Sequence, residues 1–81
     1  MKVTVYSTPA CPWCHLAKEF LTEHQIPFEE VDVSQDEAKA QEMILKSGQM
    51  GVPVIEIDGQ IVIGFNKPRL EELLGLNHEG S

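Results

Sequence analysis

The feature that most constrains the fold is a strand pattern that passes directly into an amphipathic helical pattern near the start of the chain. Val3 and Val5 alternate with more polar residues, which is the two-residue period of a strand. A helix is predicted to begin at Cys11, with Pro12 at its first helical position, where the missing N–H of proline costs nothing. It is expected to end before Ile26-Pro27, because the residue before a proline avoids the α region. This order of elements predicts the first half of a βαβ unit.

The next segment completes that unit. A second strand is predicted over residues 28–33, where Glu29-Glu30 interrupts an otherwise apolar run. The helix after it is expected to carry a capping box, with Ser34 as its N-cap and Glu37 three residues later. Gly48 is expected to end this helix, because glycine adopts the left-handed conformation readily. The first and second strands are therefore predicted to be parallel, with a right-handed connection.

The last third of the chain predicts a hairpin followed by a helix. A strand from Pro53 to Ile57 is expected to turn at Asp58-Gly59, a strong signal for a type I′ turn, and to return through residues 60–63. Asn66 is predicted to cap the final helix, and Gly75 to end it.

Together these elements predict an α/β fold in the order βαβ then ββα. We expect a four-stranded mixed sheet with three helices distributed over its two faces, the hairpin being antiparallel. One domain is predicted over residues 1–76, followed by a C-terminal tail over residues 77–81. The first helix starts at the carboxyl end of the first strand, where α/β folds usually place their ligands.

Composition and charge argue against several kinds of function. The net charge of −7 repels phosphate backbones and speaks against nucleic-acid binding. No stretch approaches the roughly 20 apolar residues of a membrane helix, and the start of the chain is too short and alternating for a signal peptide. The two cysteines are too few for a disulfide scaffold. We therefore expect a cytoplasmic protein with neither a membrane nor a nucleic-acid partner. We also expect it to be a monomer.

Both cysteines lie in the run Cys11-Pro12-Trp13-Cys14, and this spacing beside a βαβ pattern is a redox signal. A helix N-terminus directs unpaired N–H groups and a positive dipole end at a thiol, which favours the nucleophilic thiolate. A helical wheel places Cys14 on the apolar stripe that runs to His24, and Cys11 about 120° from the centre of that stripe. Cys11 is therefore expected to attack disulfides, and Cys14 to resolve the mixed disulfide that forms.

Four motifs spread along the chain carry a family resemblance. They are Tyr6-Ser7-Thr8, Cys11-Pro12-Trp13-Cys14-His15, Gly51-Val52-Pro53 and Ile63-Gly64-Phe65-Asn66. On these motifs the chain resembles the glutaredoxins and glutaredoxin-like redoxins of the thioredoxin superfamily, nearly from end to end. The resemblance implies a thioredoxin-like fold and a dithiol thiol–disulfide oxidoreductase, an electron carrier that reduces protein or glutathione mixed disulfides.

The same resemblance implies a substrate site beside Cys11. The family places the proline that corresponds to Pro53 in the cis form, so that Val52 would offer its backbone N–H and C=O to an extended peptide or to glutathione. The residues implied for substrate or glutathione binding are Thr8, Pro12, Trp13, Val52, Pro53, Gly64, Phe65 and Asn66. The resemblance implies no bound cofactor and no metal, with glutathione as a candidate co-substrate.

Three departures from the family pattern leave the electron donor open. Thr8 stands where many glutathione-using members have a lysine, and Gln49 and Met50 are uncharged where a basic residue is often found. The run Gly64-Phe65-Asn66-Lys67-Pro68 replaces the stretch that grips the amino end of glutathione. It is similar to the run in redoxins that are reduced by thioredoxin reductase. The alternative function is therefore a redoxin of that kind, serving ribonucleotide reductase or a peroxidase.

Two other kinds of site use similar cysteine patterns. Cys11 and Cys14 of two chains could share a zinc ion or an iron–sulfur cluster through four thiolates. The run also matches the haem-attachment signature C-x-x-C-H, but the strand before it and the ββα half after it argue against haem. His15 is accordingly interpreted as a surface histidine. Trp13 and Phe65 are expected either to line a substrate groove or to cover the edge of the core.

Overall fold

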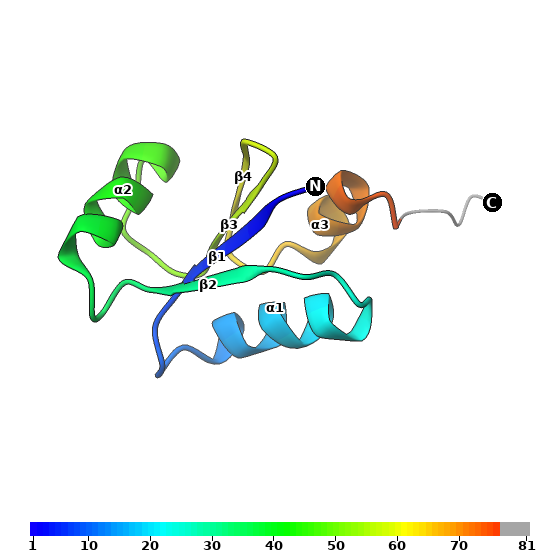
Figure 1. Ribbon diagram of the computed structural model, residues 1–81, viewed down its shortest axis with the longest axis horizontal. Coiled ribbons are helices and arrows are strands. Elements are labelled where there is room, and N and C mark those ends of the chain that lie inside the picture. Colours follow the sequence, from blue (N-terminus) through cyan, green and yellow to red (C-terminus); the bar gives the residue numbers. More distant parts are fainter. Residues whose placement is uncertain (77–81) are drawn as a thin grey trace.

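The computed structural model describes residues 1–76 of the chain. Its elements, in chain order, are β1 (Val3–Ser7), α1 (Pro12–Glu23), β2 (Glu29–Asp32), α2 (Glu37–Ser47), β3 (Val54–Ile57), β4 (Gln60–Ile63) and α3 (Lys67–Leu74). The strands form one sheet in the order β2-β1-β3-β4 (Figure 1). β1 is parallel to β2 and antiparallel to β3, and β3 is antiparallel to β4. The four-stranded mixed sheet with three helices is therefore confirmed, whereas the predicted tail over 77–81 lies outside the described residues.

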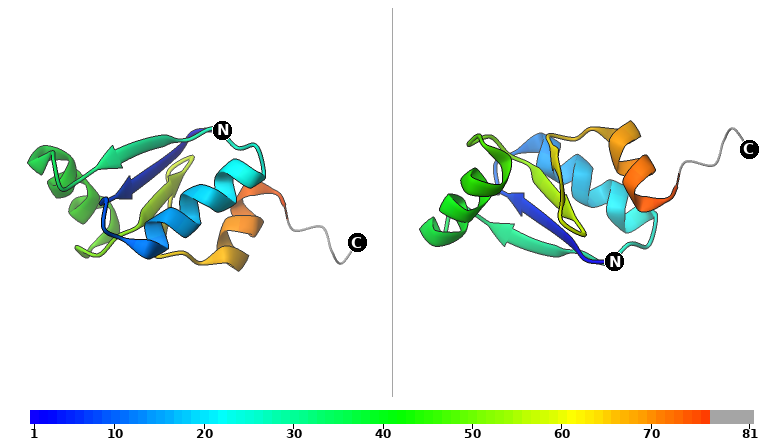
Figure 2. Two further views of the ribbon diagram at one scale, coloured as in Figure 1. Left: turned by 90° about the horizontal axis from the view of Figure 1, so that it is seen from below. Right: turned by 90° about the horizontal axis from the view of Figure 1, so that it is seen from above.

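The helices cover the two faces of the sheet unequally. α1 and α3 lie beside each other on one face, and α2 lies alone on the other (Figure 2). The larger core lies under α1 and α3, and its best-buried members include Val5, Leu21, Ile55 and Leu70. A smaller cluster of Tyr6, Met43 and Val54 lies under α2. No helix among residues 1–76 is long and apolar enough to cross a membrane.

α1 buries the stripe that the helical wheel predicts, with one exception. Cys14, Ala17, Phe20 and Leu21 are all buried. His24 was expected on this stripe and is exposed, because α1 ends at Glu23 and His24 is already its C-cap. Its imidazole ring lies 4.6 Å from the Phe20 ring, centroid to centroid, and so covers the edge of the core from outside.

The predicted capping box of α2 is wrong. The N-cap is Asp36, whose carboxylate accepts a hydrogen bond from the Lys39 N–H at 3.1 Å. Ser34 does not cap α2, because its N–H and its hydroxyl both donate to the carboxylate of Asp32 in the turn that follows β2. Glu37 consequently occupies the first turn of α2 without the N3 role, where its charge still favours the helix dipole.

The ββα half follows the sequence prediction closely. Asp58 and Gly59 have φ angles of 49° and 87°, the two positive values that a type I′ turn requires. Asn66 caps α3, since its side-chain oxygen accepts from the Arg69 N–H at 3.3 Å, and Gly75 ends the helix in the left-handed conformation. β2 and β3 are each shorter than predicted, β3 beginning only at Val54.

Candidate active site

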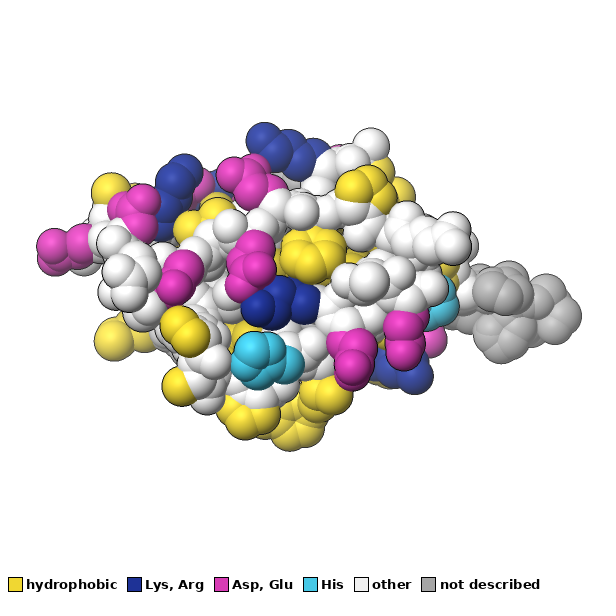
Figure 3. Space-filling model, turned by 60° about the horizontal axis from the view of Figure 1, so that its bottom comes forward, with side chains coloured by type: hydrophobic (Ala, Val, Ile, Leu, Met, Phe, Trp, Pro, Cys, Tyr) yellow, Lys and Arg dark blue, Asp and Glu magenta, His cyan; other side chains and the backbone are white. Residues whose placement is uncertain are grey.

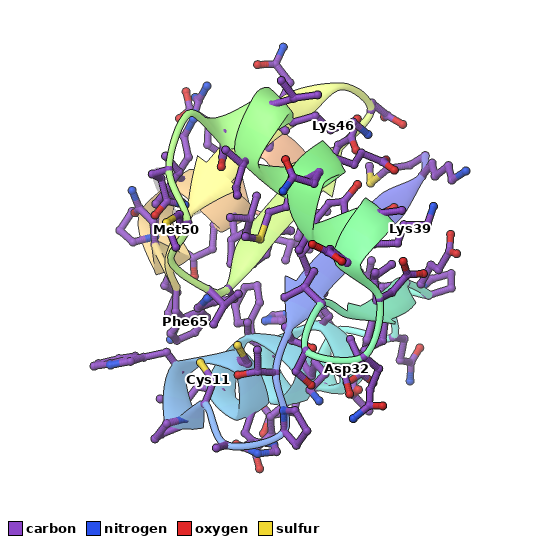
Figure 4. All side chains as sticks on the ribbon, turned by 90° about the vertical axis from the view of Figure 1, so that its left-hand side faces the viewer. Cys11, Asp32, Lys39, Lys46, Met50 and Phe65 are labelled. Carbon is purple, nitrogen blue, oxygen red and sulfur yellow. The ribbon has the colours of Figure 1, made fainter. Side chains whose placement is uncertain are left out.

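Three segments that are distant in the sequence meet at one end of the sheet. They are the start of α1, the loop over residues 48–53 between α2 and β3, and the loop over 64–66 that follows β4. Figure 4 shows Cys11, Phe65 and Met50 on the same side of the molecule, whereas Lys46 lies on α2, away from Cys11. The parallel β1–β2 pair and the antiparallel β3 bring these segments together, because β1 and β4 both end at this edge.

Cys11 is the N-cap residue of α1. Its Sγ accepts a hydrogen bond from the Cys14 backbone N–H at 3.1 Å and lies 3.8 Å from the Val52 carbonyl oxygen. The side chain is partly exposed. The backbone N–H of the first helical turn and the helix dipole both favour negative charge at this sulfur. Cys11 is thus accessible to a substrate and placed where a thiolate is stabilised.

Cys14 lies one turn later and is fully buried, with no exposed surface. Burial, as the main cause, and the hydrogen bond to Cys11 together raise the pKa of its thiol from 9.0 to about 11, whereas the Thr8 backbone and the charge of Lys18 act in the opposite direction. Cys14 therefore holds its proton at neutral pH. The two sulfurs differ in access, as the helical wheel predicts.

The surface beside Cys11 contains a shallow apolar hollow of about 250 Å³. It is lined by Trp13, Val52, Pro53, Gly64 and Phe65. The Val52–Pro53 peptide bond is cis, as the family resemblance implies. Trp13 is 59% exposed and forms one wall, while Phe65 also packs edge-on against Phe20 in the core at 5.9 Å. Phe65 thus lines the hollow and covers the core, and contact of its ring with substrate stays a prediction.

Three of the residues expected to bind substrate are not in the lining of this hollow. Pro12 is exposed at the first position of α1. Thr8 contributes its backbone, since its carbonyl accepts from the Cys11 N–H at 3.4 Å. The side-chain oxygen of Asn66 is occupied in capping α3. The structure gives Thr8 and Asn66 clear local roles beside the site, and a direct contact of either with substrate stays a prediction.

Sequence reasoning missed one residue next to the site. The side-chain amide of Gln49 binds both backbone polar groups of Gly51: its Oε1 accepts from the Gly51 N–H at 2.6 Å and its Nε2 donates to the Gly51 oxygen at 3.1 Å. The sequence shows Gln49 only as an uncharged residue where a basic one is common. No pattern in a single sequence points to this contact, which depends on how the loop folds back on itself.

The remaining polar residues have local partners. The His15 ring nitrogen Nε2 lies 3.1 Å from the Pro9 carbonyl oxygen, in an exposed position that agrees with a surface histidine. The Tyr6 hydroxyl donates to Glu42 at 3.0 Å under α2, away from the cysteines. Within residues 1–76, no group of three or more potential metal ligands is found. Acidic side chains are spread over the face shown in Figure 3 rather than gathered in one patch.

Comparison with known proteins agrees with this geometry. Residues 3–62 match the family model for glutaredoxin. The chain is 47% identical over 72 residues to a glutaredoxin-like 8.6 kDa protein of Clostridium pasteurianum, covering 89% of this chain and 96% of the relative. It is 40% identical over 62 residues to glutaredoxin 3 of Escherichia coli, covering 76% and 75% of the two chains.

Solved structures agree as well. A mutant of the thioredoxin-like protein BC3987 superposes with a TM-score of 0.88 at 36% identity, covering 94% of this chain and 97% of that one. The fold is therefore thioredoxin-like, and the family match supports thiol–disulfide exchange as the general chemistry. The chain belongs to the glutaredoxin family.

Proposed function

We propose that the protein is a dithiol oxidoreductase that reduces protein disulfides or glutathione mixed disulfides. The observation that carries the proposal is the difference between the two sulfurs. Cys11 is accessible and receives the Cys14 N–H, whereas Cys14 is fully buried with a raised pKa. A pair of this kind has one thiol for attack on an external disulfide and one that is protected until the mixed disulfide has formed.

In the first step the Cys11 thiolate attacks one sulfur of the substrate disulfide. The new Cys11–substrate S–S bond forms as the old S–S bond breaks, and the leaving substrate thiolate takes a proton from water. The Cys14 N–H, 3.1 Å from the attacking sulfur, stabilises its charge before attack. The number of disulfide bonds has not changed at this stage, because the mixed disulfide has replaced the substrate disulfide.

In the second step Cys14 loses its proton and attacks the Cys11 sulfur. An intramolecular Cys11–Cys14 disulfide forms, the bond to the substrate breaks, and the second substrate sulfur leaves as a thiolate. Two electrons have then passed from the dithiol to the substrate, which takes up two protons. The one-turn separation of the cysteines on α1 keeps the attacking sulfur close to its target.

Docking is proposed at the hollow and at the Val52 main chain. The carbonyl of Val52 already lies 3.8 Å from the Cys11 sulfur, so a substrate strand paired there would bring its own sulfur to Cys11. An apolar side chain next to the substrate disulfide would fill the hollow between Trp13 and Phe65. The partners are accordingly disulfide-containing proteins. Cytoplasmic location and a monomeric state stay predictions.

Reduction by thioredoxin reductase is the second candidate for the electron source, with ribonucleotide reductase or a peroxidase as the protein served. Charge at the site favours it over glutathione. Thr8, Gln49 and Met50 supply no cation, and Lys46, on α2, is paired with Glu42 at 3.1 Å and Glu56 at 2.8 Å. To distinguish the two electron sources, the oxidised protein is mixed either with glutathione and glutathione reductase or with thioredoxin reductase. NADPH consumption then shows which system reduces it.

A metal or iron–sulfur centre shared between two chains is the rival from another class. Each chain would offer Cys11 and Cys14, and Cys14 would have to leave its fully buried position to share a metal with a second chain. Absorbance of freshly purified protein, with iron and zinc analysis, tests this. A coloured or metal-loaded dimer would favour the rival, and a colourless monomer with two titratable thiols would remove it.

Two serine variants test the proposed function directly. Cys11→Ser is expected to abolish reduction of insulin disulfides, because the other thiol is buried and protonated. Cys14→Ser is expected to keep the attacking step and to accumulate a mixed disulfide with the substrate, detectable as a mass increase that a reductant removes. An inactive Cys14→Ser beside an active Cys11→Ser would reverse the two roles, and turnover by both variants would refute the mechanism.

A further inference from the structure

We propose that Gln49 is a positioning residue that orients the peptide group between Gly51 and Val52, so that the Val52 N–H points at the main chain of an extended substrate. The inference rests on the proposed function, in which Val52 is the docking position. It adds a residue of the loop after α2 that contacts neither cysteine. It also predicts that peptide disulfides and small disulfides respond differently when this residue is changed.

The Gln49 side chain is anchored at both of its polar atoms. Oε1 accepts from the Gly51 N–H at 2.6 Å, and Nε2 donates to the Gly51 oxygen at 3.1 Å. Gln49 itself is held by Ser47, the last residue of α2, whose hydroxyl donates to the Gln49 carbonyl oxygen at 2.9 Å and lies 2.7 Å from the Met43 carbonyl oxygen. The amide thus connects the last turn of α2 to the backbone just before Pro53.

Planarity of the peptide group carries this contact to Val52. The Gly51–Val52 bond is trans, since the only cis bond among residues 1–76 is Val52–Pro53. In a trans peptide the C=O and the N–H point in opposite directions. Holding the Gly51 oxygen on the side of Gln49 therefore turns the Val52 N–H away from Gln49. Within residues 1–76 that N–H donates to no other group, so it is free to bind a substrate carbonyl.

The same contact strengthens the donor. A carbonyl that accepts a hydrogen bond polarises its peptide group and makes the N–H at the other end a better donor. Gln49 therefore has two effects on the Val52 N–H: it sets the direction of this N–H, and it makes it a stronger hydrogen-bond donor. Neither effect operates on a substrate that has no main-chain carbonyl to offer.

Gly51 provides an independent way to break the contact. A Cβ added at Gly51 would lie 2.8 Å from the Gln49 Oε1 and 3.9 Å from its Cδ, and it would meet no other group within 4 Å. The φ angle of Gly51 is not in the positive region, so alanine is compatible with the backbone. Gly51→Ala should therefore displace the Gln49 side chain without straining the loop, and should reproduce the effect of Gln49→Ala.

The test uses reduced protein in single-turnover stopped-flow experiments, with the fluorescence of Trp13, the only tryptophan, reporting oxidation beside Cys11. The substrates are an extended peptide with a disulfide and hydroxyethyl disulfide, which has no peptide main chain. Gln49→Ala should raise the half-saturating concentration of the peptide about three- to tenfold, the range of one hydrogen bond, with the maximal rate within about twofold. The rate with hydroxyethyl disulfide should stay unchanged. Gln41→Ala, on the exposed face of α2, is the matched control.

A double-mutant cycle completes the test. If Gly51→Ala acts by displacing Gln49, it should cost nothing further in a Gln49→Ala background. Additive effects of the two changes, an unchanged peptide half-saturation in Gln49→Ala, or an equal loss with both substrates would each overturn the inference. A wild-type protein that reacts with neither disulfide would instead refute the proposed function, so the two failures are distinguishable.

Discussion

The difference between the two thiols predicts how they react with iodoacetamide. With a pKa of about 11, Cys14 is a thiolate in roughly one molecule in ten thousand at pH 7, whereas a thiol with the ordinary value of 9.0 reaches roughly one in a hundred. Since alkylation requires the thiolate, ionisation alone should slow the labelling of Cys14 about a hundredfold relative to the unfolded chain. Full burial slows it further, because the reagent has no access to the Cys14 sulfur in the folded protein.

The assay labels the native reduced protein with limiting iodoacetamide over a series of pH values, and labels the chain in urea as the reference. Fragmentation mass spectrometry assigns each label to Cys11 or Cys14, because both lie in one peptide. Singly labelled protein should carry its label on Cys11. The rate at Cys14 should rise about tenfold for each pH unit between 7 and 10, since the thiolate fraction increases in that proportion below the pKa.

Two results would contradict this reasoning. One is labelling of Cys14 in the native protein at a rate within tenfold of its rate in urea at pH 7. The other is a Cys14 rate that does not depend on pH over this range. Either would mean that burial does not keep the resolving thiol protonated, and the order of the two exchange steps would lose its physical basis.

Three further predictions concern stability. Because folding raises the pKa of Cys14, the protonated thiol contributes fully to the free energy of unfolding below pH 9, and this contribution is lost as the pH rises through about 11. In denaturation series at rising pH, the free energy of unfolding of the wild type should therefore fall by up to about 2–3 kcal/mol relative to that of Cys14→Ala. Hydrogen bonds from Lys46 and Tyr6 lower the pKa of Glu42, so its carboxylate stabilises the fold above pH 4.5 and this stabilisation is lost in acid. In Glu42→Gln the melting temperature should therefore fall less steeply as the pH is lowered. Leu70→Ala, in the core under α3, should cost about 2–5 kcal/mol in urea unfolding, and Leu45→Ala, 84% exposed, less than about 0.5 kcal/mol; equal costs would contradict the assigned core.

Most of the fold could be predicted because its signals are local. The alternation in β1, the type I′ signal at Asp58-Gly59 and the Asn66 cap each act over a few residues, and each is confirmed. The prediction of the α2 cap was wrong for an equally physical reason. Ser34 and Asp36 are both good caps, and the choice between them depends on Asp32, which occupies the Ser34 hydroxyl at the end of β2.

The candidate site was likewise predictable from the sequence only in part. Helical periodicity alone predicts that Cys14 is buried and Cys11 accessible, because both lie on one helix. The Gln49–Gly51 contact, the hollow between Trp13 and Phe65 and the raised pKa of Cys14 were not predictable from periodicity. Each depends on distances between segments that only the closed sheet brings together, or on how a loop folds back on itself.

The place of Cys11 at the start of α1 ties the redox state of the protein to the integrity of a helix. The sulfur that reacts is also the acceptor that caps this helix, through the Cys14 N–H. In its thiolate form this sulfur is a charged acceptor, and oxidation to a disulfide makes it neutral and weakens the cap, an interaction worth about 1 kcal/mol. By thermodynamic linkage the reduced form gains the difference, which raises the reduction potential by about 20 mV. The oxidised protein should therefore fray first at the start of α1, where a reductase must reach the disulfide.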